Sequence, residues 1–436
     1  MQDDPSERPG LPSIRDRYDV VVVGGGPAGT SFGRLLGRRG HDVLIVEKSR
    51  HPRFCVGESL LPGTLPVWRE LGLDERFEAA GFLRKFGAYF CFEDGARPEY
   101  FHFGDGSRVR DPHAWEVPRS RFDRLLWDAA VEDGIACIDR TTVAEVVFEG
   151  RRATGVELRL PDASRRRVGA RLVADCSGRA TLLGHQLGIR DPDPKLDKIA
   201  LYRHYDDVIR SSGDDAGTIA IVATPFGWMW LIPFAGGGAS VGALMHRAWY
   251  RERKLAGADK DAIWAEVLAS VPAVSRRLHG ATPARALEAT SDFQYRTRRL
   301  AGDGWVAIVD AGAFVDPVFS SGVHLAVTGA HAASRAAHAS LAGGRLPRAR
   351  DFAGYARRSR AVLDVYSKFI YAWYDDDFRA VFMRPPHGKF GVELLKREII
   401  SVLAGEVSPT WRVLPAIEIL LGMARLRRLV RGRRAR

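Results

Sequence analysis

Short apolar runs alternate with glycine turns and amphipathic stretches at the start of this chain. Residues 18–23, YDVVVV, read as a buried strand, and residues 41–47, HDVLIVE, read as a second one. Between them, residues 30–40 have apolar positions at helical spacing and end at a glycine. A strand, a glycine turn, a helix and a strand within about thirty residues form the layout of a βαβ unit. The pattern therefore predicts an α/β fold.

The rest of the chain mixes helical and strand patterns. Helical spacing is predicted for three segments, 64–80, 119–134 and 260–285. Alternating or aromatic-rich segments predict strands at 86–92, 97–103, 141–148, 154–160 and 171–175. Residues 217–245 contain three strand candidates separated by glycine or proline turns, which predicts an antiparallel meander. Beyond about residue 350 the pattern is largely helical.

No long linker separates these segments, so we expect one composite nucleotide-binding domain rather than free-standing modules. Residues 1–17 are expected to form a disordered tail and residues 18–340 the nucleotide-binding domain. A strand-rich substrate layer is expected within that domain, at about 81–115 and 195–290. Residues 341–436 are expected to form a helical C-terminal region that ends in a basic tail.

Composition and charge narrow the class of protein. The formal net charge is +12, but residues 421–436 carry seven arginines and no acid, so nucleic acid is not the expected partner. That tail is compatible with a solvated end, with docking to an acidic partner and with a membrane surface. The polar N-terminus predicts neither a signal nor a transit peptide, and no membrane-spanning helix is expected. Four widely separated cysteines predict reduced thiols in a cytoplasmic protein and no metal site.

A glycine motif carries the first candidate chemistry. Residues 24–29, GGGPAG, satisfy G-x-G-x-x-G between a strand and a helix. Gly24 permits the tight turn, Gly26 lets the backbone approach a pyrophosphate, and Gly29 lets the helix and the strand pack closely. Glu47 ends the second strand, where its carboxylate can accept hydrogen bonds from ribose hydroxyls. Together these features predict a dinucleotide site.

Four later residues favour FAD over a nicotinamide cofactor. Arg53 and Arg119 follow the βαβ unit at places where a long, bent cofactor needs further cations. Asp175 in DCSGR and Asp310 in DAG stand in loops after strands, so both are expected at the carboxyl edge of the sheet. Contacts so far apart in the sequence are expected when one extended cofactor threads the whole domain.

At this point the sequence resembles the FAD-dependent oxygenase superfamily, which includes aromatic hydroxylases, geranylgeranyl reductases and flavin-dependent halogenases. The resemblance rests on GGGPAG, the FD-containing helix start, DCSGR and GDGWVAIVDAG, and it covers nearly all of the first 335 residues. It implies a glutathione-reductase-like FAD-binding fold with an inserted antiparallel sheet as the substrate layer. The FAD-binding residues that it implies are Gly24, Gly26, Gly29, Glu47, Lys48, Arg53, Ser59, Arg119, Asp175, Asp310 and Gly322.

Within the superfamily, residues 226–233, FGWMWLIP, are similar to the W-x-W-x-I-P signature of the halogenases. Trp228 and Trp230 fall on one face of a strand, which also suits an ordinary core pair. In a halogenase, bulky and unreactive side chains near the flavin keep the organic substrate away from it. The resemblance therefore implies a wall, and a packed core remains the alternative.

Two further motifs resemble the halogenases. Lys85, in GFLRKFG, matches the segment that carries the catalytic lysine of that family, where an amine holds the hypohalous acid released at the flavin. An exposed lysine is the alternative. Residues 316–323, DPVFSSGV, match the family's halide loop, and the backbone amides of Ser321 and Gly322 are the expected chloride ligands. An ordinary helix N-cap by Ser320 or Ser321 is compatible with the same residues.

Phe319 stands where tryptophan halogenases carry a glutamate, so the base that an indole substrate needs is missing. A phenol ionises by itself. The DPVFSSG form resembles the branch of the family that acts on phenolic, pyrrolic or carrier-protein-tethered intermediates of antibiotic, including polyketide, pathways. The resemblance thus implies an FADH2- and O2-dependent chlorinating enzyme. Because no second G-x-G-x-x-G occurs, a separate flavin reductase is the expected source of reduced flavin. An aromatic hydroxylase or monooxygenase and a flavoprotein of the geranylgeranyl reductase type remain alternatives.

Overall fold

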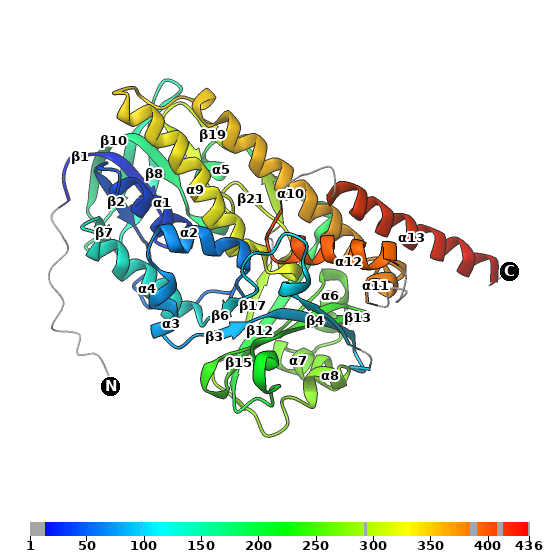
Figure 1. The fold of residues 1–436 in the computed structure, drawn as a ribbon. Helices are drawn as coiled ribbons and strands as arrows, with labels where there is room; N and C mark the ends of the chain where they lie inside the picture. Colours follow the sequence, from blue (N-terminus) through cyan, green and yellow to red (C-terminus); the bar gives the residue numbers. More distant parts are fainter. Residues whose placement is uncertain (1–13, 97, 292–293, 384–389, 408–412, 435–436) are drawn as a thin grey trace.

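The structure, a computed structural model, describes residues 14–434 except 97, 292–293, 384–389 and 408–412 (Figure 1). Most of the expected N-terminal tail, residues 1–13, lies outside the described residues, and the first strand already begins at Arg17. Two eight-stranded sheets and a set of long helices make up the molecule, together with a two-stranded and a three-stranded sheet. The α/β class predicted from the sequence is confirmed.

The first sheet contains the predicted βαβ unit. Its path is β19-β20-β10-β1-β2-β7, and the β8–β9 hairpin joins it at β10. Val20 and Val22 of β1 are buried on one face and Val21 and Val23 on the other, because helices and strands cover both sides. The strands are β1 (Arg17–Val23), β2 (Val43–Val46), β7 (Ala136–Ile138), β8 (Thr142–Glu149), β9 (Arg152–Arg159), β10 (Arg165–Asp175), β19 (Ala301–Gly302) and β20 (Trp305–Ala307).

Helices α1 (Pro27–Gly37), α4 (Arg119–Glu132) and α9 (Ser321–Ala342) pack against one another and against strands of the first sheet. Helix α1 contacts both α4 and α9. Small residues such as Ala330 and Ala333 line the buried side of α9, which lets it lie close to the sheet. The long α9 (yellow) runs beside α1 in Figure 1 and brings its N-terminus toward the second sheet.

The second sheet has the path β16-β12-β15-β14-β13-β4-β5, with β17 also paired to β12. The predicted meander is confirmed, because β14 pairs antiparallel with both β13 and β15. Trp228, Trp230 and Ile232 belong to one apolar cluster, whereas Met229 and Leu231 belong to another. The strands are β4 (Gly87–Phe92), β5 (Glu99–His102), β12 (Lys198–Asp206), β13 (Ile219–Thr224), β14 (Gly227–Pro233), β15 (Ala239–His246), β16 (Thr282–Pro283) and β17 (Glu288–Ser291).

The C-terminal region is helical, and it packs on the face of the second sheet that carries the tryptophans. Its helices are α10 (Ala353–Trp373), α11 (Asp376–Phe382), α12 (Phe390–Leu403) and α13 (Val413–Arg434). Aromatic side chains make this contact: Phe90 of β4 meets Trp373 and Phe382 edge-on, with ring centroids 5.5 and 5.1 Å apart. Within the described residues, no helix combines the length and the apolar character needed to cross a bilayer.

Two helices differ from the sequence prediction. The segment predicted as one helix at 64–80 forms α2 (Leu65–Glu70) and α3 (Asp74–Ala79), because Gly72 between them takes a left-handed φ of +64°. The segment predicted as a helix at 260–285 forms α7 (Lys260–Ala269) and α8 (Pro272–Ser275) only. Pro272 opens a new helix after Val271, whose φ of −127° and ψ of 79° are not helical, and β16 follows at Thr282.

The remaining elements are short. They are β3 (Leu83–Lys85) paired with β6 (Ala114–Glu116), the three-stranded sheet β11 (Arg190–Pro192), β18 (Tyr295–Thr297) and β21 (Ala313–Phe314), and the helices α5 (Leu182–Gln186) and α6 (Arg247–Leu255). The β3–β6 pair matters for the site described below, because Lys85 of β3 shares a small cavity with side chains of β4, β5 and β13 of the second sheet.

Candidate active site

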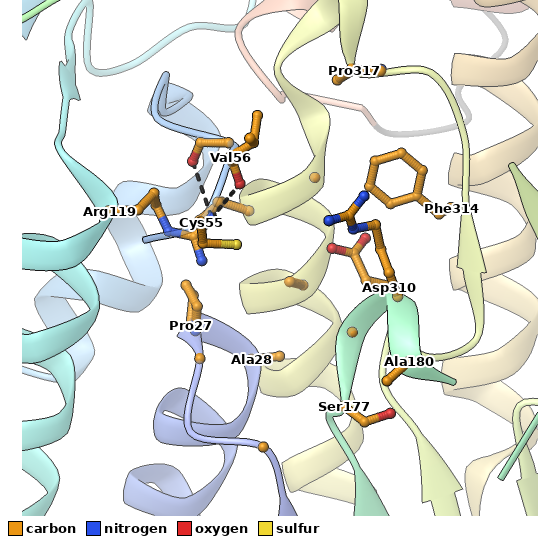
Figure 2. Close-up of a pocket in the computed structure, with 18 of the residues that line it drawn as sticks. Pro27, Ala28, Cys55, Val56, Arg119, Ser177, Ala180, Asp310, Phe314 and Pro317 are labelled. Atoms are coloured by element: carbon orange, nitrogen blue, oxygen red, sulfur yellow. Dashed lines mark hydrogen bonds between the residues drawn. The ribbon is translucent and has the colours of Figure 1, made fainter. Parts of the chain in front are cut away.

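A cavity of about 610 Å³ is lined by residues of both large sheets. The glycine turn before α1, the segment 46–59 and the loop 176–180 contribute from the first sheet, and β14 contributes the two tryptophans from the second. The segment 309–326, which leads into α9, completes the lining. Figure 2 shows the turn at Pro27 and Ala28, Arg119, and the loops at Ser177 and Asp310 facing this space. Segments distant in sequence thus meet at one site.

The glycine turn has the geometry expected of a dinucleotide cradle. Gly24 takes a left-handed φ of +105°, and a Cβ there would lie 2.5 Å from the carbonyl oxygen of Cys176. A Cβ on Gly29 would lie 1.9 Å from the carbonyl oxygen of Gly24, so the helix and the strand touch backbone to backbone. At Gly26, among the described atoms, an added Cβ would meet Arg53 Nη2 alone, at 3.3 Å. This glycine therefore opens toward the cavity.

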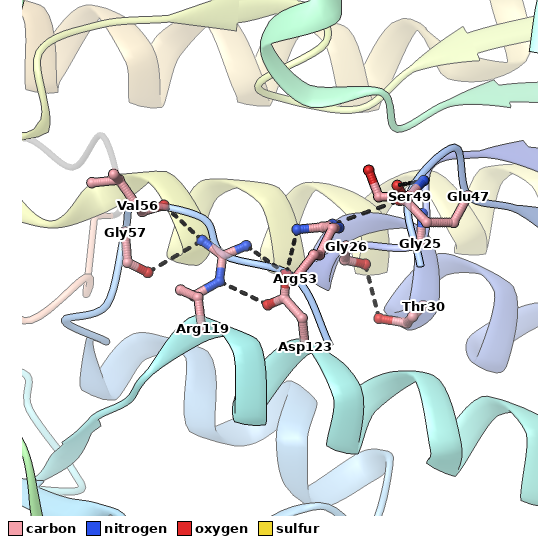
Figure 3. A network of polar contacts seen from close by, with 10 residues as sticks. All are labelled: Gly25, Gly26, Thr30, Glu47, Ser49, Arg53, Val56, Gly57, Arg119 and Asp123. Carbon is pink, nitrogen blue, oxygen red and sulfur yellow. Dashed lines mark hydrogen bonds and ion pairs between the residues drawn. The ribbon is translucent and has the colours of Figure 1, made fainter. Parts of the chain in front are cut away.

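Glu47 and the two predicted arginines form one polar network (Figure 3). Glu47 accepts hydrogen bonds from the backbone amides of Gly25 at 2.8 Å and Ser49 at 2.9 Å. Arg53 lies 3.6 Å from Glu47 and 3.0 Å from Asp123, and Arg119 donates two hydrogen bonds to the same Asp123. Asp123, fully buried on α4, was not singled out from the sequence although it belongs to the FD helix start. It holds both cations at the cavity.

The structure places the two predicted aspartates differently. Asp310 lines the cavity with a φ of +76°, and its burial raises the pKa of the carboxyl to about 7. Asp175 ends β10, but its carboxylate accepts hydrogen bonds from the backbone amides of Ser177 and Leu183, and it does not line the cavity. Its position is that of a group that shapes the loop before α5. Lys48, Ser59 and Gly322, the other predicted cofactor residues, do line the cavity.

Trp228 and Trp230 both line the cavity from β14, and their ring centroids are 5.6 Å apart. Both are nearly fully buried, and Trp230 Nε1 donates a hydrogen bond to Ser240 Oγ of the neighbouring strand at 3.2 Å. Trp230 also covers Gly242, where an added Cβ would lie 2.1 Å from the indole. The two interpretations of this pair, a packed core and a cavity wall, are therefore both compatible with its position.

The predicted halide loop stands where the cavity meets the N-terminus of α9. Asp316 accepts a hydrogen bond from Val318 N at 3.0 Å, and Ser320 takes a left-handed φ of +54° just before the helix begins. Ser320 is the N-cap residue of α9, but within the described residues its side chain makes no capping hydrogen bond. Ser321 and Gly322 are the first two residues of α9, where backbone amides lack helical acceptors, and both line the cavity.

Lys85, which follows Arg84 in the sequence, is buried, so the alternative of an exposed lysine is wrong. It is 1% exposed and lines a second, much smaller cavity of about 10 Å³, surrounded by Leu61, Ala88, Phe90, Phe101, Phe103, Ile219, Ile221, Phe319, Ser320 and Leu403. Burial lowers the pKa of its amine to about 8. Ser320 and Ile219 line both cavities. The space around Lys85 therefore adjoins the large cavity at the predicted halide loop.

Two buried glutamates of this region were missed by the sequence reasoning. Glu58 lines the large cavity, and one of its oxygens lies 2.8 Å from His204 Nε2 on β12. Glu116, fully buried on β6, accepts a hydrogen bond from Ser59. The signal for Glu58 was its place in the segment VGES beside the predicted Ser59. Glu116 carried no such signal, because its partners come from other parts of the chain.

Comparison with known proteins decides the family. Residues 17–363 match the family model described as an FAD binding domain. A 1H-pyrrole-2-carbonyl-(peptidyl-carrier protein) chlorinase from Pseudomonas fluorescens is 32% identical over 343 residues, which cover 73% of this chain and 75% of that protein. The chain belongs to the flavin-dependent halogenase family. A tryptophan 2-halogenase from Chondromyces crocatus is 32% identical over 327 residues, 74% of this chain, and the chain spans 62% of its length.

Solved structures show the same relationship. The myxobacterial chondrochloren halogenase has a TM-score of 0.76 at 28% identity, and the match covers 94% of this chain and 98% of that one. A flavoprotein/dehydrogenase from Cytophaga hutchinsonii has a TM-score of 0.85 at 29% identity, covering 95% of this chain and 100% of that one. The C-terminal helices of this halogenase-family chain are therefore part of a shared architecture, because both matches extend well beyond residue 363 of the family model.

FAD, the cofactor of this halogenase-family chain, fits the residues of the large cavity. The backbone at Gly26 and the uncapped N-terminus of α1 would face the pyrophosphate, where the unpaired amides and the helix dipole favour an anion. Arg53 stands beside that turn and would add a positive charge. Glu47 would meet the ribose at the end of β2. The opening at Gly26, which a Cβ would fill, is the observation that supports this fit.

Proposed function

We propose that this protein is an FADH2- and O2-dependent halogenase that chlorinates an electron-rich aromatic intermediate of natural-product biosynthesis. One observation carries the proposal: the buried amine of Lys85 lies in a small aromatic cavity that shares Ser320 and Ile219 with the FAD cavity. An enzyme that only oxygenates a substrate at the flavin has no use for an amine placed behind the halide loop. A halogen carrier needs an amine at that position.

Each residue group has a defined part in the proposed reaction. Bound reduced FAD would supply two electrons to O2, and the O2 so activated would be the oxidant that converts halide into hypohalous acid. The amides of Ser321 and Gly322 would hold chloride at the positive end of α9. Lys85 would receive the hypohalous acid and keep it near the substrate, because the other side chains that line its cavity are apolar except for Ser320. Trp228 and Trp230 would keep the organic substrate out of the FAD cavity.

The substrate proposed is phenolic, with a pyrrole as the nearest alternative. Four phenylalanines, Phe90, Phe101, Phe103 and Phe319, line the cavity of Lys85, whose volume of about 10 Å³ has room for a species about the size of a water molecule and not for an aromatic ring. Phe319 offers no carboxylate to deprotonate an indole, whereas a phenol near a cation ionises without a base. The name of the similar chlorinase from Pseudomonas fluorescens gives its substrate as a pyrrole-2-carbonyl group on a peptidyl carrier protein. This name supports the pyrrole alternative.

Two protein partners are proposed with this activity. The sequence has no second dinucleotide motif, so a separate reductase would supply reduced flavin. A carrier protein that tethers the substrate is the second partner. Helix α13 supports it: Arg425, Leu426 and Leu429 are exposed along this arginine-rich helix, and carrier proteins are acidic. We also propose that the fold is glutathione-reductase-like and that the second sheet is its inserted substrate layer.

A hydroxylase or a reductase-like flavoprotein remains the second candidate. The likeness to a flavoprotein/dehydrogenase from Cytophaga hutchinsonii, which covers 95% of this chain, favours retaining it. Both candidates share the FAD cavity, so the glycine turn cannot distinguish a halogenase from a hydroxylase or a reductase. The products that form with and without halide distinguish them.

We expect the protein, supplied with FAD, a flavin reductase, O2 and chloride, to replace one ring hydrogen of a phenolic substrate with chlorine. Mass spectrometry of products from one phenol, offered free and on an acyl carrier protein, is the measurement. Exchange of chloride for bromide should replace the product with its brominated analogue. An oxygenated product formed equally well without halide would favour the hydroxylase. Equal turnover of free and tethered phenol would argue against the carrier protein as a partner.

The tryptophan wall predicts a change in product rather than a loss of chemistry. Trp230→Ala removes an indole from the lining of the FAD cavity, which would open the proposed wall toward the substrate, at a cost of about 3–5 kcal/mol in stability. We expect the ratio of oxygenated to halogenated product to rise at least several-fold in the fraction that still binds FAD. Trp230→Phe, which keeps most of the bulk, is the matched control and should retain the wild-type ratio. An unchanged ratio in Trp230→Ala would leave packing as the role of this residue.

A further inference from the structure

A buried chain of hydrogen bonds joins Lys85 to a carboxylate. Lys85 Nζ donates to Ser59 Oγ at 2.7 Å and to the carbonyl oxygen of Leu60 at 3.1 Å. Ser59 Oγ in turn donates to Glu116 Oε1 at 3.0 Å. The backbone fixes this arrangement, because β3 pairs antiparallel with β6 and Ser59 forms a bridge with Glu116. Lys85, Ser59 and Glu116 therefore stand in line on three adjoining segments.

The chain is closed to solvent. Lys85, Ser59 and Glu116 are 1, 4 and 0% exposed, and the ring of Phe103 lies 5.2 Å from the ammonium nitrogen. Glu116 is the charged group that acts on Lys85 among the described residues. Among the described residues, the other carboxylate oxygen of Glu116, Oε2, has no hydrogen-bond partner.

Glu58 is the next acidic group, but it acts on Glu116 and itself pairs with His204. A buried carboxylate with one hydroxyl donor and no direct salt bridge is costly, so its retention calls for an explanation. Packing alone does not supply one, because a leucine or a methionine would fill the same volume without that cost.

We propose that Glu116, acting through Ser59, is the positioning residue that takes up the proton of Lys85 and returns it during halogen transfer. The inference rests on the proposed halogenase function for the identity of the co-reactant, hypohalous acid. It adds a residue outside the FAD cavity and outside the halide loop. Ser59 lines the large cavity and also accepts a hydrogen bond from Lys85, so it contacts both sites.

The chemistry balances in two steps. In the first, the Lys85 ammonium passes a proton through Ser59 to Glu116, and the neutral amine attacks the chlorine of hypochlorous acid. The N–Cl bond forms, the O–Cl bond breaks, and the hydroxide takes the second amine proton and leaves as water. In the second step, the ring carbon attacks chlorine while Glu116 returns its proton through Ser59 to the nitrogen. The ring proton then leaves by way of water and returns to the Lys85 amine, so that the aromatic ring and the starting ammonium are both restored.

Burial brings the pKa values of Lys85 and Glu116 closer together than they are in water. It lowers the pKa of Lys85 to about 8, an effect that Glu116 partly opposes. It raises the pKa of Glu116 to about 8, an effect that Lys85 and Ser59 partly oppose. In water the ammonium would hold its proton far more tightly than the carboxylate. A donor and an acceptor of similar pKa exchange a proton in either direction, as a shuttle requires.

The test follows the Lys85 amine directly. The FAD-bound protein is labelled with ¹³C at lysine Cε, and the Lys85 resonance is assigned by its loss in Lys85→Met. The two buried groups should titrate as a pair, so the wild-type curve is expected to be broad and centred near pH 8. In Glu116→Gln the partner anion is gone. Lys85 should then titrate in one step, about one pH unit lower.

Controls separate this result from a general loss of charge or of folding. Glu157→Gln removes another carboxylate that is 9% exposed, on β9 of the first sheet, and should leave the Lys85 titration unchanged. Ser59→Ala keeps Glu116 but breaks the bridge, and should lower the midpoint by a smaller amount. A midpoint unchanged in both Glu116→Gln and Ser59→Ala would overturn the proposal. This readout requires no turnover, so it decides the proposal even if the halogenase assay fails.

A kinetic measurement tests the return of the proton. In Glu116→Gln we expect kcat for chlorination to fall about 10²-fold with KM nearly unchanged, because general acid–base assistance is lost and binding is not. The acid limb of the pH–rate profile should move down with the Lys85 midpoint. A fall in kcat without that shift would indicate a merely structural role for Glu116 and would contradict the shuttle.

Discussion

Lys85→Ala is expected to reduce chlorinated product by about 10³-fold or more while the protein still binds FAD. The reason lies in the separation of the two cavities. Lys85 lines the small cavity and not the large one, so its removal leaves the glycine turn and the arginine network in place. Hypohalous acid would still form but would have no amine to hold it near the ring. Product mass spectrometry and the absorbance of bound FAD measure the two outcomes separately.

Lys85→Met sharpens this expectation. Methionine fills nearly the same volume without an amine, so it avoids the cavity that alanine leaves in a tightly packed aromatic cluster. It should be as inactive as Lys85→Ala. Lys368→Ala removes an exposed lysine paired with Glu418 on the surface and should keep full activity. Undiminished chlorination by Lys85→Met would refute the role of the amine and the proton shuttle that depends on it.

The local features of the FAD site could be predicted from the sequence. The turn at residues 24–29 and the strands around it follow from glycine conformation and hydrophobic period, both of which act over a few residues. The same holds for the face shared by Trp228 and Trp230, which follows from the period of a strand. The direction of the Asp175 side chain could not be predicted. A position after a strand does not determine whether a carboxylate faces the cofactor or accepts hydrogen bonds from the amides of its own loop, as Asp175 does.

The parts that could not be predicted depend on contacts between distant segments. Glu116 meets Lys85 because β3 and β6 pair across a connection of about thirty residues, and no local pattern specifies that partner. Asp123 was inconspicuous for the same reason: it bridges Arg53 and Arg119 only after α4 has docked. The helix predicted at 260–285 failed for a local reason, since Pro272 interrupts it.

Gly29→Ala is expected to abolish FAD binding and to destabilise the fold, whereas Gly26→Ala should fold normally and bind FAD weakly. The contrast follows from where each methyl group would lie. At Gly29 the nearest atom is a backbone oxygen 1.9 Å away, so α1 and β1 must separate, which costs about 1–3 kcal/mol or more. At Gly26 the nearest described atom is the end of the flexible Arg53 side chain at 3.3 Å. Its φ of −83° also suits an L-residue.

The methyl group of Gly26→Ala would instead project into the cavity, where the backbone must approach the pyrophosphate. Loss of that approach should weaken FAD binding about 10- to 100-fold, by roughly 1.4–2.7 kcal/mol, while the apoprotein Tm changes little because alanine at a helix N-cap costs about 1 kcal/mol. Thermal melts of the apoproteins and fluorescence titrations with FAD measure the two quantities independently. Wild-type affinity in Gly26→Ala would remove the cradle from the proposed FAD site, and a wild-type Tm in Gly29→Ala would show that α1 tolerates separation from β1.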